Sequence, residues 1–200
     1  MQVNNAVIAN ASDTQPEVSR RRFLKTSLIA ATVASSNIIM PKAALAVPHG
    51  EGSLCELSFR NLHTGEKFDG AYRVGNKYLL GALNEVNTVL RDFRTGDVYP
   101  MDPQLMDIIY TMQKLSGAQG RDVEIISGYR SPKTNAMLRG RSSGVAKKSF
   151  HMKGQAIDLR IPGISTARLR DIAKSLKTGG VGYYASSNFV HIDTGTVRSW

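Results

Sequence analysis

The chain has 200 residues, a length typical of one domain, and its 42% hydrophobic and 21% charged residues are those of a globular protein. A single cysteine, Cys55, excludes an intramolecular disulfide framework and a cysteine-based metal cluster, and only four histidines can serve a site that needs imidazole. The formal net charge of +10 favours an anionic partner: a nucleic acid, an anionic lipid or an anionic polymer.

The N-terminal segment resembles an export signal. Residues 19–25, SRRRFLK, match the twin-arginine pattern S-R-R-x-F-L-K at every specified position. The uncharged stretch that follows, Thr26 to Met40, is 15 residues long, which is too short for a membrane-spanning helix. The sequence Ala44-Leu45-Ala46 then fits an A-x-A cleavage site. We therefore predict a twin-arginine signal peptide at residues 1–46, exported by the twin-arginine translocase, and a mature domain at residues 47–200.

Export to the periplasm narrows the choice of partner. The signal peptide would remove five basic and two acidic residues, so the mature chain keeps a net charge of +7. An exported protein does not meet nucleic acid where it works, which leaves the cell wall and the membrane surface. The residues before Cys55 form a poor lipobox, so we expect no stable membrane anchor after cleavage and a buried, apolar role for Cys55.

The mature chain mixes short strands with amphipathic helices. Alternating apolar residues and turn signals predict strands at residues 54–61, 66–72, 122–127, 155–161 and 188–193. Helical spacing and capping residues predict helices at residues 80–93, 103–116 and 165–176 and another that begins at Pro132. This order favours an α+β fold with a small, mostly antiparallel sheet and flanking helices.

The last two predicted strands carry ionisable side chains on one face. Alternation places Asp158 on one strand, and His191 and Asp193 on the other, opposite the apolar residues of each strand. If the strands are neighbours, these three side chains converge. Gly154 permits the chain to turn, so that His151 can fold back beside Asp158.

Two imidazoles and one carboxylate are a common ligand set for catalytic zinc, with one coordination position left open for water. A second carboxylate nearby would then serve as a general base. The same residue types also occur without a metal, since a histidine on a strand is often a core or surface residue and an aspartate near a turn is often a cap. Spacing alone leaves both interpretations open.

Three motifs, in order along the chain, resemble those of M15-type zinc peptidases of the LAS group. Residues 151–158, HMKGQAID, are similar to the H-x-x-G-x-A-x-D motif of these enzymes. Residues 189–193, FVHID, resemble the strand with their last ligand, and residues 127–131, SGYRS, resemble their S-G-Y-R-S turn. The resemblance covers essentially the whole mature chain and points to the twin-arginine-exported, MepK-like (YcbK-like) branch of murein endopeptidases.

This resemblance implies the LAS/M15 peptidase fold, shared by hedgehog and D-Ala-D-Ala peptidases, with zinc held by His151, Asp158 and His191. It also implies a periplasmic enzyme that hydrolyses peptide bonds of peptidoglycan, in its stem peptides and cross-links. An endopeptidase that cuts cross-links is the leading expectation. A D,D-carboxypeptidase and a non-catalytic, metal-bearing peptidoglycan-binding domain are the alternatives.

The catalytic groups depart from the family pattern at one position. Many LAS enzymes carry a glutamate base three residues before the final histidine ligand, where this chain has Asn188, which cannot accept a proton from water. We predict Asp193 as the base, with orientation of a histidine ligand as its alternative role. Arg130 is expected to polarise the scissile carbonyl or to hold a substrate carboxylate, with a salt bridge that closes its turn as the alternative.

The remaining polar residues have less specific patterns. A basic run precedes His151 and is expected to be a solvated loop, with attraction of the carboxylates of stem peptides as the alternative; it comprises Arg139, Arg141, Lys147 and Lys148. We expect His49 and His63 to be exposed and uninvolved, and Ser127 and Tyr129 to be structural.

Overall fold

The computed structural model describes residues 52–142 and 144–200; the predicted signal peptide and His49 lie outside these ranges. No helix in the described residues is long and apolar enough to cross a membrane. The elements in chain order are β1 (Leu54–Asn61), β2 (Lys67–Val74), β3 (Lys77–Tyr78), α1 (Leu80–Val89), α2 (Pro103–Ser116), β4 (Asp122–Ser127), α3 (Pro132–Arg141), the 3-10 helix η1 (Phe150–Lys153), β5 (Ala156–Arg160), α4 (Thr166–Leu176), β6 (Gly180–Tyr184), β7 (Phe189–Asp193) and β8 (Arg198–Ser199).

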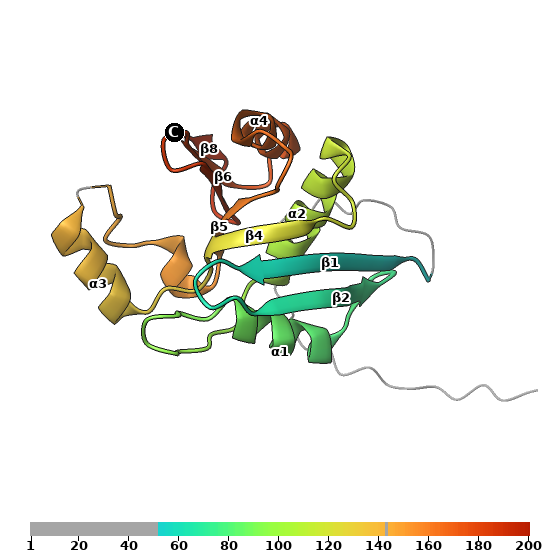
Figure 1. The fold of residues 1–200 in the computed structure, drawn as a ribbon, viewed down its shortest axis with the longest axis horizontal. Coiled ribbons are helices and arrows are strands. Elements are labelled where there is room, and N and C mark those ends of the chain that lie inside the picture. The colour runs from blue at the N-terminus through green and yellow to red at the C-terminus, as the bar shows by residue number, and fades with distance from the viewer. Residues whose placement is uncertain (1–51, 143) are drawn as a thin grey trace, which may run out of the picture. The chain divides into compact units, whose positions relative to one another are not determined.

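The strands of the described residues form one sheet in the order β3-β2-β1-β4-β5-β7-β6-β8. Figure 1 shows β2, β1 and β4 side by side in this sheet. Neighbouring strands are antiparallel except in the pairs β1–β4 and β6–β8. The predicted α+β class with a mostly antiparallel sheet is therefore confirmed. The sequence patterns did not predict β3, β6 and β8. Two of these have only two residues, and β6 contains two glycines, which weaken any strand signal.

One face of the sheet packs against α1, α2 and α4 in a continuous apolar core. β1 alternates between buried and more exposed residues, and Cys55 is fully buried, as predicted. On α2, Asp102 accepts a hydrogen bond from the backbone N–H of Gln104, and Pro103 occupies the first turn. The helix ends at Gly117, whose φ of +71° suits glycine.

The segment after α1 contacts the turn between β4 and α3. The helix predicted at residues 80–93 ends at Val89, because the chain turns there and brings Asp92 into the protein. The Asp92 carboxylate accepts hydrogen bonds from the backbone N–H groups of Arg94 and Ser131, and the Leu90 carbonyl accepts one from Tyr129. These contacts fix the turn between β4 and α3.

Candidate metal centre

Strands β5 and β7 place two of the predicted ligands side by side. The strands are antiparallel neighbours, and their register pairs Asp158 with His191 and Ala156 with Asp193. On the other face of β5, Ile157 and Leu159 are fully buried in the apolar core. The expected alternation of both strands is therefore confirmed: one face packs into the core and the other presents the polar groups.

The turn at η1 brings His151 to the same place. The side chain of Ser149 caps η1 by accepting the backbone N–H of His151, and the chain then reverses at Gly154, whose φ is +65°. A Cβ atom at Gly154 would collide with the carbonyl oxygen of Pro100, so this position also requires glycine for lack of space. The predicted turn between His151 and Asp158 is thus present.

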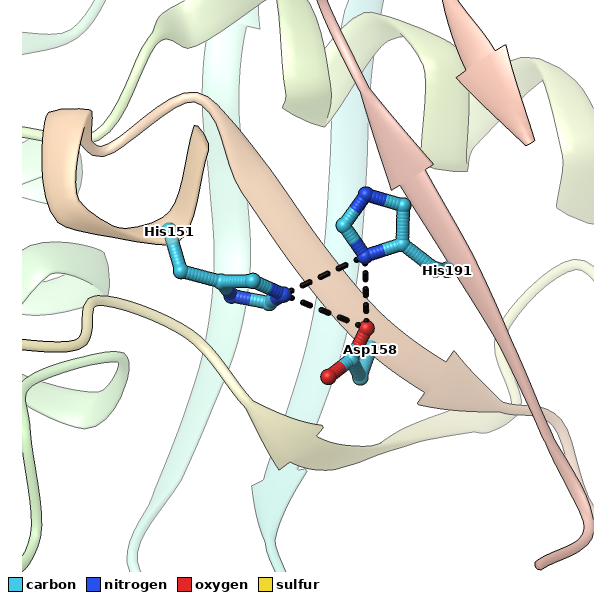
Figure 2. Close-up of side chains that lie close together, drawn as sticks. All are labelled: His151, Asp158 and His191. Carbon is cyan, nitrogen blue, oxygen red and sulfur yellow. Dashed lines mark hydrogen bonds and ion pairs between the residues drawn. The ribbon is translucent and has the colours of Figure 1, made fainter. Parts of the chain in front are cut away.

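Figure 2 shows the three side chains pointing toward one another from η1, β5 and β7. Nε2 of His151 lies 3.2 Å from Nδ1 of His191 and 3.3 Å from Oδ1 of Asp158, and Nδ1 of His191 lies 2.8 Å from the same oxygen. All three ligand atoms lie within 4.8 Å of one another, and all three residues are buried. Within the described residues, this is the arrangement of side chains suited to a metal ion.

The outer nitrogen of each imidazole has its own acceptor. Nδ1 of His151 donates to the carbonyl oxygen of Gly128 at 2.8 Å, and Nε2 of His191 donates to Oδ2 of Asp193 at 3.0 Å. With protons on these outer atoms, the two inner nitrogens present lone pairs toward the Asp158 carboxylate. A divalent cation satisfies all three groups at once, so the donor set fits a metal ion.

The electrostatics of the cluster also favour a positive charge. Burial by itself would raise the pKa of Asp158, but His151 and His191 hold that pKa well below its usual range. Burial lowers the pKa of His191, yet its hydrogen bonds to Asp158 and Asp193 outweigh this effect and raise the pKa to about 9. A proton at Nδ1 of His191 and a metal ion would satisfy the same carboxylate, so a bound metal ion would take the place of that proton.

Asp193 contacts the predicted ligand His191 on the side away from the cluster. Both of its oxygens are occupied: Oδ1 accepts from the backbone N–H groups of Gly180 and Gly195 at 3.1 and 2.9 Å, and Arg198 donates to both oxygens at 3.0 and 2.6 Å. Burial raises the pKa of Asp193, but His191 and Arg198 outweigh it and hold the pKa below its usual range. A carboxylate with a lowered pKa is a weaker base than a free one, and both oxygens of Asp193 already accept hydrogen bonds.

Arg130 reaches the cluster from the turn after β4. Its guanidinium lies 3.6 Å from Oδ2 of Asp158 and donates to the hydroxyl of Ser127 at 3.4 Å, while its Nε is buried with no hydrogen-bond acceptor among the described residues. Burial lowers the pKa of Arg130, and Asp158 counteracts this. Position 128 of this turn requires glycine, because a Cβ atom at Gly128 would collide with the Leu90 carbonyl.

Other predicted residues lie outside the cluster. Asn188 has a φ of +52° in the turn before β7, and its amide oxygen contacts the hydroxyl of Thr166 at 3.5 Å rather than any ligand. His63 is exposed, as expected, and its ring stacks on Phe93 with centroids 3.9 Å apart. Tyr129 stacks on an aromatic neighbour, in line with a structural role.

Sequence patterns did not single out Trp200, which borders the cluster. Its ring centroid lies 5.3 Å from that of His191, its Nε1 donates to the hydroxyl of Tyr184 at 3.0 Å, and the residue is 52% exposed. A Cβ atom at Gly182, the partner of His191 in β6, would lie 2.8 Å from the indole. The signal for this contact in the sequence is Gly182. It can be interpreted only once the register of β6 and β7 is known.

Comparison with known proteins agrees with this geometry. A family model described as "Peptidoglycan L,D-endopeptidase MepK" matches residues 51–200. A probable peptidoglycan L,D-endopeptidase MepK of Haemophilus influenzae is 41% identical over 182 residues, which are 91% of this chain and 95% of the relative. The peptidoglycan L,D-endopeptidases MepK of Escherichia coli K12 and Shigella flexneri are each 49% identical over 144 residues, 72% of this chain and 79% of each relative.

Proposed function

Because the chain belongs to the family of the peptidoglycan L,D-endopeptidase MepK, we propose that it hydrolyses cross-links of peptidoglycan at peptide bonds between an L- and a D-configured centre. The observation that carries this proposal is the buried cluster of His151, Asp158 and His191, whose inner atoms face one another while the outer nitrogens are held by other groups. A cluster built in this way suits metal-dependent hydrolysis rather than structural packing.

Zinc is the ion that we propose for this site, since two imidazoles and one carboxylate form a known catalytic zinc set with an open position. When bound, zinc supplies Lewis-acid polarisation of the scissile carbonyl and lowers the pKa of a coordinated water to about 7. The carbonyl of Gly128 and the carboxylate of Asp193 keep both imidazoles in the tautomer that offers a lone pair.

Arg130 and Asp193 are proposed to act beside the ion. The guanidinium of Arg130 is positioned by Asp158 and Ser127, and it carries a fixed positive charge suited to a substrate carbonyl or carboxylate. Of the two roles predicted for Asp193, its five hydrogen-bond contacts favour orientation of His191 over proton transfer from water.

Purified sacculi test this proposal directly. The full chain is incubated with sacculi and zinc, with and without a chelator, and the released fragments are identified by mass spectrometry. We expect cross-link cleavage that the chelator abolishes and added zinc restores, and His63→Ala serves as a histidine control outside the cluster. Release of free D-alanine alone would instead show a carboxypeptidase, and zinc binding without any release would show a non-catalytic binding domain.

We also propose that residues 1–46 direct export by the twin-arginine translocase and that the enzyme works in the periplasm. The support is the SRRRFLK motif with its uncharged stretch and A-x-A site. Because lysines do not reproduce the paired guanidinium groups, Arg20→Lys with Arg21→Lys should leave the protein in the cytoplasm. Fractionation followed by N-terminal sequencing checks this, with Val47 expected as the first residue of the exported wild-type chain.

A further inference from the structure

A second charged feature adjoins the metal centre. Between Arg130 and Lys153 the sequence contains no aspartate or glutamate. Residues 132–142 and 144–149, which comprise α3 and the segment after it, are here named the basic arm. Its five basic residues are Lys133, Arg139, Arg141, Lys147 and Lys148, and all of them are exposed. A run of one charge sign on a single exposed element sets up a local field that attracts anions.

The basic arm is not part of the apolar core. The buried residues of α3 are the polar Thr134 and Asn135, and no helix or strand of the described chain packs extensively against it. Figure 1 shows α3 standing apart from α2 and α4. The apolar residues Met137 and Leu138 of α3 are only partly buried and do not belong to the core, so core formation does not account for the sequence of this helix.

The cations of the basic arm have no internal counter-charges. None of the five forms an ion pair with a described residue. Elsewhere, several arginines are paired, such as Arg91 with Glu66 at 2.6 Å and Arg160 with Glu124 at 2.6 Å. The positive charge of the arm is therefore free to interact with an anionic partner.

Both ends of the basic arm are fixed at the metal centre. The backbone N–H of Arg130 donates to the carbonyl of His151 at 3.2 Å, which closes the arm at its base. Farther along, the side chain of Asn135 donates to the carbonyl of Ala146 at 3.1 Å and ties α3 to the returning segment. The base of the arm therefore lies beside the predicted ligand His151, and a polymer held along the arm reaches the cluster at this end.

We propose that the basic arm is a docking surface for the carboxylate groups of peptidoglycan stem peptides next to the cross-link that is cut. This inference rests on the proposed function, which supplies a polymer with repeated carboxylates. Five dispersed, solvated cations suit such a repeating anion better than one small ligand, because each contact is weak and several act together. Binding through the arm is therefore sensitive to salt.

The test compares two quadruple variants of the full chain. The arm variant is Arg139→Gln, Arg141→Gln, Lys147→Gln and Lys148→Gln. The control variant removes the same charge from exposed sites on β3, α2 and α4 by Lys77→Gln, Lys114→Gln, Arg168→Gln and Lys174→Gln. Binding to purified sacculi is measured by brief sedimentation at 4 °C in low and high salt, and again with sacculi whose carboxyl groups have been amidated.

We expect the arm variant to bind sacculi about tenfold more weakly than wild type in low salt, from the summed loss of four exposed charge contacts. High salt or amidation should weaken wild-type binding to the same level, and the control variant should bind nearly as well as wild type. Equal binding by the arm variant, equal loss in the control variant or undiminished binding to amidated sacculi would each overturn the proposal.

Two further measurements separate this inference from its alternatives. Stronger arm-dependent binding to vesicles of phosphatidylglycerol than to sacculi would overturn it in favour of a membrane surface. Hydrolysis of soluble cross-linked fragments by the wild-type chain is measured in parallel. If that hydrolysis is absent while arm-dependent binding to sacculi persists, the proposed function fails and the docking surface stands.

Discussion

The candidate metal centre and the basic arm differ in whether their charged groups have partners within the described residues, although one short stretch of chain joins them. In the centre, Asp158 and Asp193 are buried, and every oxygen contacts a histidine, an arginine or a backbone N–H. In the arm, the cations are exposed and have no ion pair with any described residue. Catalytic groups must be positioned to within a fraction of an ångström. Attraction of an anionic polymer requires only a positive electrostatic field that extends into the solvent.

Removal of a ligand should give the largest effect. In Asp158→Ala, two imidazoles remain without the carboxylate between them, so zinc binding and hydrolysis of sacculi should both fall to background. Metal content by mass spectrometry of the purified variant is measured together with fragment release. A variant that keeps zinc and activity would show that this cluster is not the catalytic centre.

Loss of Arg130 should come next. Arg130→Ala removes a buried charge beside Asp158, and we expect kcat to fall roughly 10²–10³-fold while zinc stays bound. Arg130→Lys keeps the charge but not the planar fork, so it should recover only part of the rate. Circular dichroism serves as the control: an unfolded Arg130→Ala would mean that the residue mainly closes its turn.

Asp193→Asn separates the two roles of that carboxylate. If Asp193 orients His191, zinc affinity should fall roughly 10- to 100-fold, and excess zinc should restore much of the hydrolysis. If it is the base, zinc affinity should hold and hydrolysis should fall roughly 10²–10⁴-fold at saturating zinc. Titration of the apoprotein with zinc, followed by the rate at each occupancy, distinguishes the two results.

The smallest effect should come from a leucine in the arm. Leu138→Ala in α3 should change the free energy of unfolding by no more than about 0.5 kcal/mol, because this helix contributes nothing to the core. The same substitution at the fully buried Leu159 should cost about 2–5 kcal/mol. Urea unfolding of both variants checks the contrast, and a loss of equal size at Leu138 would show that the arm is packed.

The polar faces of β5 and β7 could be predicted because the side chains of a strand alternate strictly. That rule placed Asp158 and His191 on one surface, and the observed register pairs them. Of the two groups that hold the outer nitrogens, the Asp193 carboxylate was among the sequence predictions, as an alternative role, whereas the other group was not. The partner of His151 is the backbone carbonyl of Gly128, and a carbonyl has no signature in a sequence.

The long elements of the fold could be predicted from the sequence, whereas its shortest strands and the end of α1 could not. The long amphipathic helices and apolar strands were visible, whereas β3 and β8 have two residues each, too few for a periodic pattern, and are defined by their pairing with β2 and β6. The early end of α1 depends on Asp92, which is buried by its hydrogen bonds to a turn that lies 39 residues away. Contacts of that kind belong to the tertiary structure and leave no local pattern.

The position of Trp200 next to His191 allows the candidate metal centre to be followed by tryptophan fluorescence. It is the single tryptophan of the chain, and its indole lies against His191. Tryptophan emission therefore comes from one site, without background from other indoles. Binding of Co²⁺ at the ligands should quench this emission, and a substrate fragment that covers the exposed ring should shift its wavelength, so occupancy can be followed in real time without a label.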